Sequence, residues 1–289
     1  MNDTLIGLLL NGTVAGLGYA LLGAAFGFSY SGGRFFNVAF PIPLVVAAYV
    51  TCVAVDSIPA SVRIIFAVFL GVLAGLFADV FLFRKLHNTG ASALLLFVAS
   101  LGAYTAFEAT VATVFGVTPL SPRGGGDEPV YTILGAHILR PRLFLALFAC
   151  VLLFVWAFTR RTQHVLEVRA ACLSPMVAEV HGINVARART LAIAFSSFSA
   201  AICGVALTFD TDATPAMGFE LLLTAATVAF VGGVPNVAGA LGAGLLLGVA
   251  ESCMIGIWGG VWRNATVFLV LMIVMYAYPR GLMGSSQRT

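Results

Sequence analysis

Charged residues are scarce in this sequence. Only 9% of its 289 residues are charged, whereas 60% are hydrophobic and the mean hydropathy is +1.02. A soluble globular domain carries about 25% charged residues, so this chain has too few polar groups to cover a surface that faces water. Its outer surface must face an apolar medium, for which lipid is the usual candidate. We therefore expect an integral membrane protein.

Lysine is nearly absent, and with it one class of function. Lys85 is the single lysine among 15 basic residues, and the formal net charge is only +3. It lies outside any G-x-x-x-x-G-K-[ST] pattern, so the chain has no P-loop for ATP. Zinc-protease, hydrolase-elbow and flavin motifs are missing too. We expect no enzyme and no cofactor in this chain. No basic run with interleaved aromatics indicates a nucleic-acid partner.

Metal-binding and disulfide patterns are also missing. None of the five cysteines forms a C-x-x-C pair, and four of them lie in apolar stretches, which predicts neither a disulfide framework nor a zinc site. They are interpreted as small buried apolar side chains. The four histidines lie in loops or near the ends of apolar runs at unrelated spacings, so we expect no metal site.

What the sequence does contain is long apolar runs. A membrane-spanning helix needs about 20 mostly apolar residues. The second and seventh of nine candidates are short, so eight to ten spans are expected. The predicted fold is an all-α polytopic transmembrane bundle, a single domain over 1–289, without room for a soluble domain. No basic segment precedes the first run, so we expect no cleaved signal peptide. The candidates are 5–30, 41–55, 62–83, 92–115, 143–158, 190–209, 219–231, 237–257 and 265–278.

The basic residues predict the orientation of these spans. Cytoplasmic loops of membrane proteins are enriched in Lys and Arg. With nine spans and a cytoplasmic C-terminus, ten of the 15 basic residues fall inside and five outside. We therefore predict that the N-terminus is outside and the C-terminus inside.

Two connections are longer than a simple turn. The predicted external loop, 116–142, is rich in proline and glycine, and its residues 130–139 predict a strand or hairpin with Gly135 at the bend. The predicted cytoplasmic segment, 159–189, is moderately basic and has a helical pattern.

One short helix stands out in the cytoplasmic segment. Ser174 can cap a helix whose first position is Pro175, where a missing N–H costs nothing. Gly182 is a natural stop after about two turns. Such a helix is marginal in water, so we expect it to dock on a partner surface. Its apolar side is formed by Met176, Val177 and Val180.

Three acidic residues, Asp79, Glu108 and Glu251, lie inside predicted spans. A charge at the bilayer centre costs at least about 2.5–3.5 kcal/mol on insertion scales. Glu251 and Glu108 are either carboxylates of a gate or translocation path, or hydrogen-bonded carboxyls that fix helix packing. Asp79 lies one turn from Arg84, which favours a structural role. The helix before Glu251 has glycines whose spacing permits close packing, namely Gly239, Gly242, Gly244 and Gly248.

A polar series lies in and just after the first span. It comprises Asn11, Tyr19, Tyr30 and Asn37. Asn can bridge helices in lipid, so these residues either hold helices together or line a path.

Three stretches, in order and spacing, cover nearly the whole chain. They are NGT and GLGYAL at 11–21 with NVAF at 37–40; RAAC at 169–172 with Ala178 and GIN at 182–184; and ATVAFVGGVPNVAGALG at 226–242 with GVAE at 248–251 and PRGL at 279–282. Together they resemble the permease subunits of the branched-chain amino-acid ABC importer family, which includes relatives that import urea and short amides. The third stretch is the most specific. One departure is that Phe40-Pro41-Ile42 stands where family members typically have His-Gly-Glu.

The resemblance implies a membrane-spanning permease subunit of an ATP-binding-cassette importer, multi-pass in the cell inner (plasma) membrane. It would translocate branched-chain amino acids or related small polar solutes. The implied partners are a second homologous permease, one or two cytoplasmic ATPases that bind ATP and Mg, an extracytoplasmic solute-binding protein and membrane lipid. The alternative is an ion-coupled secondary transporter or channel that uses the intramembrane carboxylates.

The resemblance also implies roles for named residues. The segment that would couple to the ATPase comprises Ser174, Pro175, Met176, Val177, Ala178, Glu179, Val180, Gly182, Ile183 and Asn184. The candidate residues of a translocation path or gate are Asn11, Tyr19, Asn37, Glu108 and Glu251.

Overall fold

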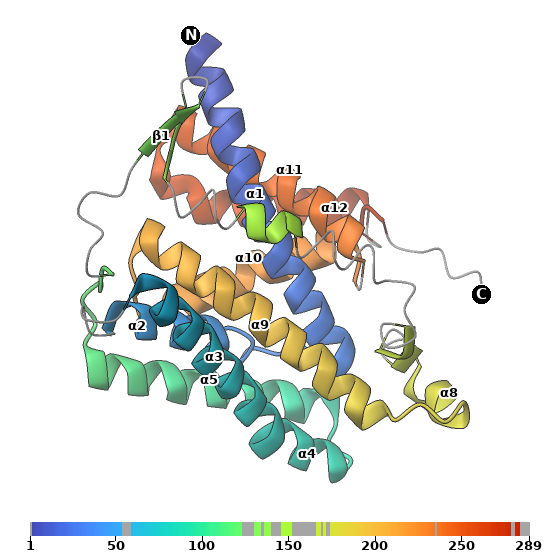
Figure 1. Cartoon of the computed structure of the whole chain (residues 1–289). Helices are drawn as coiled ribbons and strands as arrows, with labels where there is room; N and C mark the ends of the chain where they lie inside the picture. Colours follow the sequence, from blue (N-terminus) through green and yellow to red (C-terminus); the bar gives the residue numbers. More distant parts are fainter. Residues whose placement is uncertain are drawn as a thin grey trace. The chain divides into compact units, whose positions relative to one another are not determined.

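Long helices make up most of the described chain (Figure 1). The structure is a computed structural model, and it describes residues 2–53, 59–122, 130–133, 136–139, 146–151, 166–168, 170–171, 174–234, 236–278 and 281–283. The helices are α1 Asn2–Gly33, α2 Ile42–Val53, α3 Ala60–Ala78, α4 Arg84–Asn88, α5 Ala93–Phe115, α8 Pro175–Val180, α9 Val185–Thr211, α10 Met217–Gly232, α11 Val237–Trp258 and α12 Arg263–Ala277. A π-helical turn, Asp79–Phe83, joins α3 to α4, and a 3₁₀ turn, Gly260–Trp262, precedes α12.

Six stretches of helix are long and apolar enough to cross a bilayer, and they confirm a polytopic helical membrane protein. Two further apolar helices, α2 and α10, are shorter, as expected for the second and seventh candidates. The fifth candidate, 143–158, lies mostly outside the described residues, where only 146–151 is seen as helix. The number of nine spans and the orientation of the termini stay predictions.

Two short strands interrupt the helical pattern. β1 Val130–Ile133 and β2 Ala136–Leu139 pair antiparallel, with Val130 opposite Leu139 and Ile133 opposite Ala136. The hairpin predicted over 130–139 is therefore confirmed, and the fold is helical with one small hairpin.

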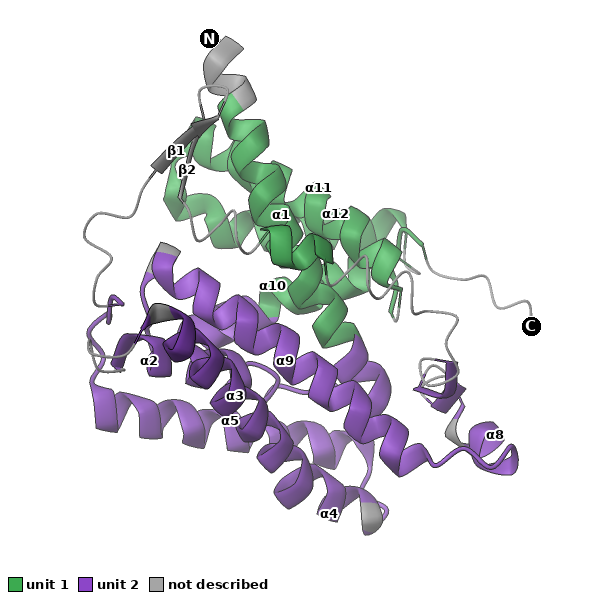
Figure 2. Cartoon of the chain, in the orientation of Figure 1, with its two compact units in different colours: residues 1–27, 124–153, 223–289 green, residues 28–123, 154–222 purple. Residues whose placement is uncertain are grey.

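The chain falls into two compact units (Figure 2). Unit 1 comprises Met1–Gly27, Gly124–Leu153 and Leu223–Thr289, and unit 2 comprises Phe28–Arg123 and Phe154–Leu222. Each unit is assembled from segments that are far apart in the sequence. The prediction of a single domain over 1–289 is not tested by this division.

In unit 1, α1 and α11 meet through glycines. A Cβ added to Gly16 would lie 2.8 Å from the carbonyl oxygen of Gly244, and one added to Gly244 would lie 2.5 Å from the backbone nitrogen of Ala20. Gly12 and Gly248 meet in the same way one turn along each helix. Small residues permit this close backbone approach in lipid. The predicted glycine packing of α11 is confirmed at these positions.

In unit 2, small residues bring α2, α3 and α9 together. Ala47, Ala67, Ala201 and Val205 form a buried cluster, and a Cβ on Gly71 would lie 2.7 Å from the carbonyl oxygen of Pro43. The opposite side of α3 carries bulky exposed side chains, namely Ile65, Phe66, Phe69, Leu73 and Phe77. This contrast between a small-residue face and a bulky face indicates which side of α3 meets helices and which meets lipid.

Candidate functional site

The short helix predicted in the 159–189 segment is α8, and its ends lie where the sequence places them. Ser174 is the N-cap and Pro175 is the first helical residue. The side chain of Ser174 makes no capping hydrogen bond within the described chain, contrary to expectation; its carbonyl oxygen accepts from the N–H of Ala178 at 3.0 Å. The start of the helix is therefore fixed through the backbone and the proline.

The end of α8 is a tight two-bond cap. Gly182 has φ +76°, where glycine carries no Cβ strain, and its N–H donates to the carbonyl of Glu179 at 2.9 Å. The N–H of Ile183 donates to the carbonyl of Ala178 at 3.0 Å, which completes a Schellman motif. Asn184 then caps α9 by accepting from the N–H of Arg187 at 3.0 Å. Both helices are thus joined by a short, hydrogen-bonded connection.

The two sides of α8 differ in burial. Ala178 is buried in a small cluster with Ala171 and Ala188, against which Val168, Ile183 and Val185 pack. The apolar side chains on the other side are exposed: Met176 is 81%, Val177 55% and Val180 82% exposed. The polar Glu179 is exposed as well. A row of exposed apolar side chains, on a helix whose opposite side is packed against the rest of the chain, is a surface suited to binding a partner.

An ion pair connects the start of α9 to the end of α3. Nη2 of Arg189 lies 3.0 Å from Oδ1 of Asp79, and the two side chains are 12% and 1% exposed. Arg84 in α4 donates to the hydroxyl of Thr190 at 2.9 Å. Consecutive residues of α9 are therefore held by the segment that contains the π-helical turn.

Asp79 does not pair with Arg84, although the sequence places the two residues about one turn apart along one helix. The π-helical turn lies between them, and the N–H of Arg84 donates to the carbonyl of Asp79. The guanidinium of Arg84 reaches Thr190, while Arg189 provides the charge for Asp79. The expectation of a structural role agrees with an almost fully buried pair.

In unit 1, a second ion pair and a hydrogen bond from its arginine bring together two of the predicted path residues. Oε1 of Glu251 lies 2.6 Å from Nε of Arg263, and the side chains are 6% and 36% exposed. Nη2 of Arg263 donates to the hydroxyl of Tyr19 at 2.8 Å. Helices α1, α11 and α12 each contribute one residue, so Tyr19 and Glu251 meet through an arginine that was not predicted as a site residue.

Asn11 and Asn37 occupy different settings. Oδ1 of Asn11 is buried in α1 without a hydrogen-bond partner in the described chain. Asn37 lies in the turn after α1, where its amide donates to Oγ of Ser29 at 3.1 Å and its Oδ1 accepts from the N–H of Ala39 at 3.0 Å. Asn37 thereby shapes the turn, and its role as a path residue stays a prediction.

The departure from the family pattern lies in this turn. Phe40 and Ile42 are buried, at 4% and 8% exposure, and Ser100 of α5 accepts from the N–H of Val38 at 3.1 Å. A polar triplet here would be buried, so the apolar replacement suits its surroundings.

Glu108 lines a cavity of about 420 Å³ in unit 2. Within the described residues, no group of three His, Cys, Asp or Glu side chains is placed to hold a metal ion.

Two arginines of these networks, Arg189 and Arg263, were counted in the sequence only as loop charges. The sequence does carry a signal for Arg263. Gly259 and Gly260 separate two apolar runs, and a tight turn at these glycines brings the end of the first helix close to the start of the second. Arg189 carries a weaker signal, since its partner lies 110 residues away. Only the fold brings that pair together.

The most family-specific stretch, 226–242, forms the closely packed turn between α10 and α11. Gly233 has φ +86°, and Oδ1 of Asn236 accepts from the N–H groups of Ala238 and Gly239 at 3.1 and 3.3 Å. The amide of Asn236 donates to the carbonyl of Met283 at 3.2 Å, and the N–H of Leu282 donates to Val231 at 2.7 Å. The motif therefore ties the C-terminal segment to this turn.

Comparison with known families and proteins identifies relatives of this arrangement. The sequence model of a family described as "Branched-chain amino acid transport system / permease component" matches residues 8–277. LivH of Salmonella typhimurium, a high-affinity branched-chain amino acid transport system permease protein, is 30% identical over 142 residues, or 49% of this chain and 44% of LivH. A probable LivH of Methanocaldococcus jannaschii is 24% identical over 151 residues, with 48% of its length covered. The matched segment thus spans about half the length of each relative.

A solved structure has a similar overall fold. The chain of PsaBC from Streptococcus pneumoniae, solved in complex with Fab, matches with a TM-score of 0.57 over 97% of each chain at 12% identity. At this identity the likeness concerns the fold alone.

Proposed function

Because the chain belongs to the family of branched-chain amino acid transport system permease components, we propose that it is the membrane-spanning permease subunit of an ATP-driven importer of branched-chain amino acids. It has no ATP site of its own, and separate ATPase subunits bind ATP and Mg. A solute-binding protein delivers the amino acid outside, and a second homologous permease completes the pathway. The chain lies in the inner membrane with its N-terminus outside and its C-terminus inside.

The observation that carries this proposal is α8. A helix of six residues cannot hold itself in water, yet α8 starts at Pro175, ends in a Schellman cap, is anchored through Ala178, and exposes Met176, Val177 and Val180. Burial of each such side chain is worth about 1.5–3 kcal/mol. An ATPase groove that accepts these three side chains would hold the helix firmly.

The connection from α8 to the membrane supports a mechanical role. The Schellman cap and Asn184 leave little slack between α8 and α9. The Arg189–Asp79 pair then links the start of α9 to the helical run of α3 and α4. A displacement of α8 by ATPase closure would therefore move α9 and α3 together, which is what alternating access requires.

The Glu251–Arg263–Tyr19 network supports a gate in unit 1. It joins α1, α11 and α12, and the arginine is 36% exposed, so the pair can exchange partners with water. We propose that this pair opens and closes when the helices rearrange. Asn11 lies two turns from Tyr19 on α1, and its oxygen is buried without a partner in the described chain. We propose that the rearrangement of the helices exposes this oxygen as a second polar contact for the solute.

The test is reconstitution of the complete complex with ATPase and solute-binding protein in proteoliposomes. Val180→Asp should weaken ATPase attachment about 10- to 100-fold, which corresponds to about 1.4–2.8 kcal/mol, because a charge replaces an apolar side chain that the ATPase would bury. Leucine uptake and ATPase occupancy are measured together. The matched control Val180→Leu retains an apolar side chain and should couple normally.

Normal uptake with full ATPase occupancy in Val180→Asp would contradict the coupling role of α8. Purification of the wild-type chain from its native membrane provides an independent check. An importer permease brings an ABC ATPase with it, whereas an ion-coupled secondary transporter does not.

A further inference from the structure

Glu108 differs from Asp79 and Glu251 in its surroundings. Asp79 pairs with Arg189 and Glu251 pairs with Arg263. Glu108 forms no hydrogen bond or ion pair with any residue that the structure describes. It lies in the middle of the second half of α5, a helix of 23 residues that is long and apolar enough to cross the membrane. An unpaired carboxylate at such a position is a functional residue by default, because its charge is costly in lipid.

The cavity beside Glu108 has the size and composition of a small-molecule site. Its volume of about 420 Å³ lies within the usual range of roughly 300–1,000 Å³. Glu108 is the only ionisable side chain of the lining, and the remaining residues are small and mostly apolar. They are Thr105, Ala109, Ala112, Val117, Thr214, Pro215 and Ala216.

The walls of this cavity are fixed by contacts at its rim. Leu120 and Ala213 form an isolated antiparallel bridge, with N–H to carbonyl distances of 2.9 and 2.8 Å. Ser121 donates to Oδ1 of Asp212 at 2.7 Å. The segment after α5 is thus tied to the segment before α10, so Val117 and Thr214 are held around Glu108.

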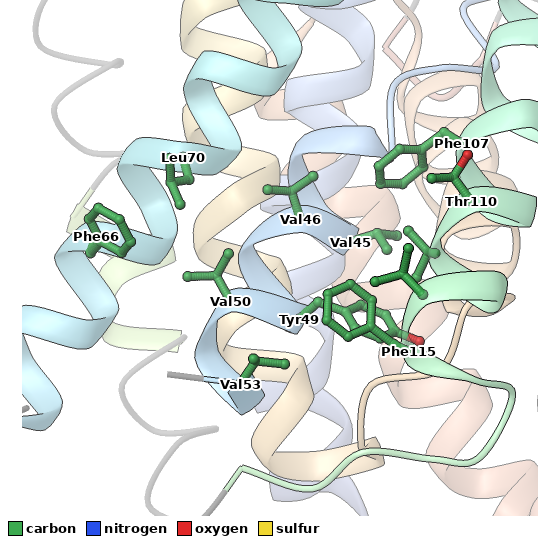
Figure 3. A pocket seen from close by; sticks show the side chains of 12 residues that line it. Val45, Val46, Tyr49, Val50, Val53, Phe66, Leu70, Phe107, Thr110 and Phe115 are labelled. Atoms are coloured by element: carbon green, nitrogen blue, oxygen red, sulfur yellow. The ribbon is translucent and has the colours of Figure 1, made fainter. Parts of the chain in front are cut away.

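The other side of α5 carries a lipid-facing hollow, which can be compared with the cavity at Glu108. A groove of about 460 Å³ lies there between α2, α3 and α5, and its lining is apolar apart from Thr110 and the Tyr49 hydroxyl (Figure 3). Phe66, Val53 and Val114 are more than half exposed along it. Thr110 donates to the carbonyl of Ala106 within α5, and none of the residues that line the groove is charged at neutral pH. The cavity at Glu108 is therefore chemically distinct from its neighbour.

We infer that the cavity at Glu108 binds the ammonium group of an amino acid on its way through the permease. The carboxylate would accept a charge-assisted hydrogen bond from the ammonium group. The methyl-bearing lining of Ala109, Ala112 and Val117 would contact an aliphatic side chain. This inference rests on the proposed function. In it, the ammonium group of the solute is the cation that neutralises Glu108.

The first experiment asks whether the cavity is open to water. In a chain whose five native cysteines have been replaced, Glu108→Cys should react with a charged, membrane-impermeant methanethiosulfonate reagent. The matched control is Thr110→Cys, which lies two residues along α5 toward the apolar groove and should react at least tenfold more slowly. Millimolar leucine should slow the reaction of Ala112→Cys, which lines the same cavity and retains the Glu108 carboxylate, and should not slow that of Thr110→Cys. Equal reactivity of Glu108→Cys and Thr110→Cys, or no protection of Ala112→Cys by leucine, would overturn the inference.

The second experiment uses the whole reconstituted complex and leucine as the probe. Glu108→Gln should raise the KM for leucine uptake about tenfold, corresponding to about 1.4 kcal/mol, while ATPase activity stimulated by the loaded binding protein stays unchanged. Glu108→Asp retains the charge and should restore most of the uptake. A KM for Glu108→Gln equal to that of the wild type would overturn the inference and leave the proposed function intact.

Leucine transport by the wild-type permease in the absence of any ATPase would contradict the proposed function instead. Leucine uptake that depends on an external cation, and is lost with that dependence in Glu108→Gln, would assign Glu108 to a coupling ion and overturn the ammonium site.

Discussion

Each compact unit buries one acidic side chain against an arginine, but the two pairs differ in their exposure. In unit 2, Asp79 and Arg189 are 1% and 12% exposed, and Oδ2 of Asp79 has no partner in the described chain. In unit 1, Glu251 is 6% exposed, whereas Arg263 is 36% exposed and also bonds the Tyr19 hydroxyl.

The difference teaches which pair can move. Separating a fully buried pair leaves a bare charge without water, which costs several kcal/mol. A partly exposed arginine can separate from its partner at a much lower cost wherever its exposed part faces water. Asp79–Arg189 is therefore suited to transmit force between α9 and α3, and Glu251–Arg263 is suited to open and close.

The largest expected effect comes from breaking the buried pair. Arg189→Met leaves Asp79 charged and unpaired, so we expect a loss of about 3–5 kcal/mol in stability. Thermal unfolding of the detergent-purified protein, followed by size-exclusion fluorescence, measures it.

A double variant keeps this test decisive if Arg189→Met does not fold. Asp79→Leu with Arg189→Met replaces both charges by apolar groups and should recover most of the stability, because such exchanges are often neutral. A single variant as stable as the wild type would show that the pair is not the clamp of unit 2.

The glycine contact between α1 and α11 sharpens the comparison in unit 1. Gly248 lies one turn before Glu251, and Gly16 lies one turn before Tyr19. Gly248→Ala inserts a Cβ 2.5 Å from Cα of Gly16, and such overpacking should cost about 1–3 kcal/mol. Leucine uptake should fall as the network widens. The matched control is Gly242→Ala on the same helix, where the Cβ meets no described atom within 4 Å. Equal melting temperatures for the two variants would refute the backbone contact.

The exposed pair should contribute less to stability than to transport. Glu251→Gln is expected to cost only about 1 kcal/mol in stability, because Arg263 is 36% exposed and is not left fully buried without its partner, while leucine uptake drops several-fold. Tyr19→Phe removes one hydrogen bond and should cost about 0.5–1.5 kcal/mol. Uptake and melting temperature are measured on the same preparations. A loss of stability as large as that of Arg189→Met would erase the distinction between the two units.

The smallest structural disturbance is expected from cysteine labelling of two exposed tips. Val180→Cys in α8 and Val261→Cys in the turn before α12 replace side chains that are 82% and 95% exposed. A membrane-impermeant maleimide should label Val180→Cys only from the cytoplasm and Val261→Cys only from outside, with unchanged stability. Labelling of both from one side would contradict the proposed orientation.

Much of the helical pattern could be predicted because lipid imposes it. Long apolar runs must form helices in a bilayer, and the observed bounds of α5 and α11 lie within a residue or so of the predicted ones. The short helix α8 was predictable from Pro175 and Gly182, since both residues act locally on the backbone. The hairpin at 130–139 was predictable from its turn residues for the same reason.

The pairings within the site could not be predicted, because they depend on which helices become neighbours. Asp79 and Arg189 are separated by 110 residues, and Tyr19 and Arg263 by 244. The π-helical turn after Asp79 has no clear local signal, yet it separates Asp79 from Arg84. The predicted cap at Ser174 is wrong in detail, since the side chain makes no capping hydrogen bond in the described chain and only the backbone carbonyl accepts one.

The glycine contact of α1 with α11 joins two segments that are synthesised at very different times. Gly12 and Gly248 are 236 residues apart (248 − 12). Chains grow at about 5–20 residues per second, so α1 leaves the ribosome roughly 10 to 50 s before its partner. Throughout that interval the backbone groove of α1 and the Tyr19 hydroxyl lack the residues that later cover them. Unit 1 closes only when synthesis is nearly complete, so a chain released before α11 leaves Gly12 and Gly16 of α1 without the glycines that pack against them.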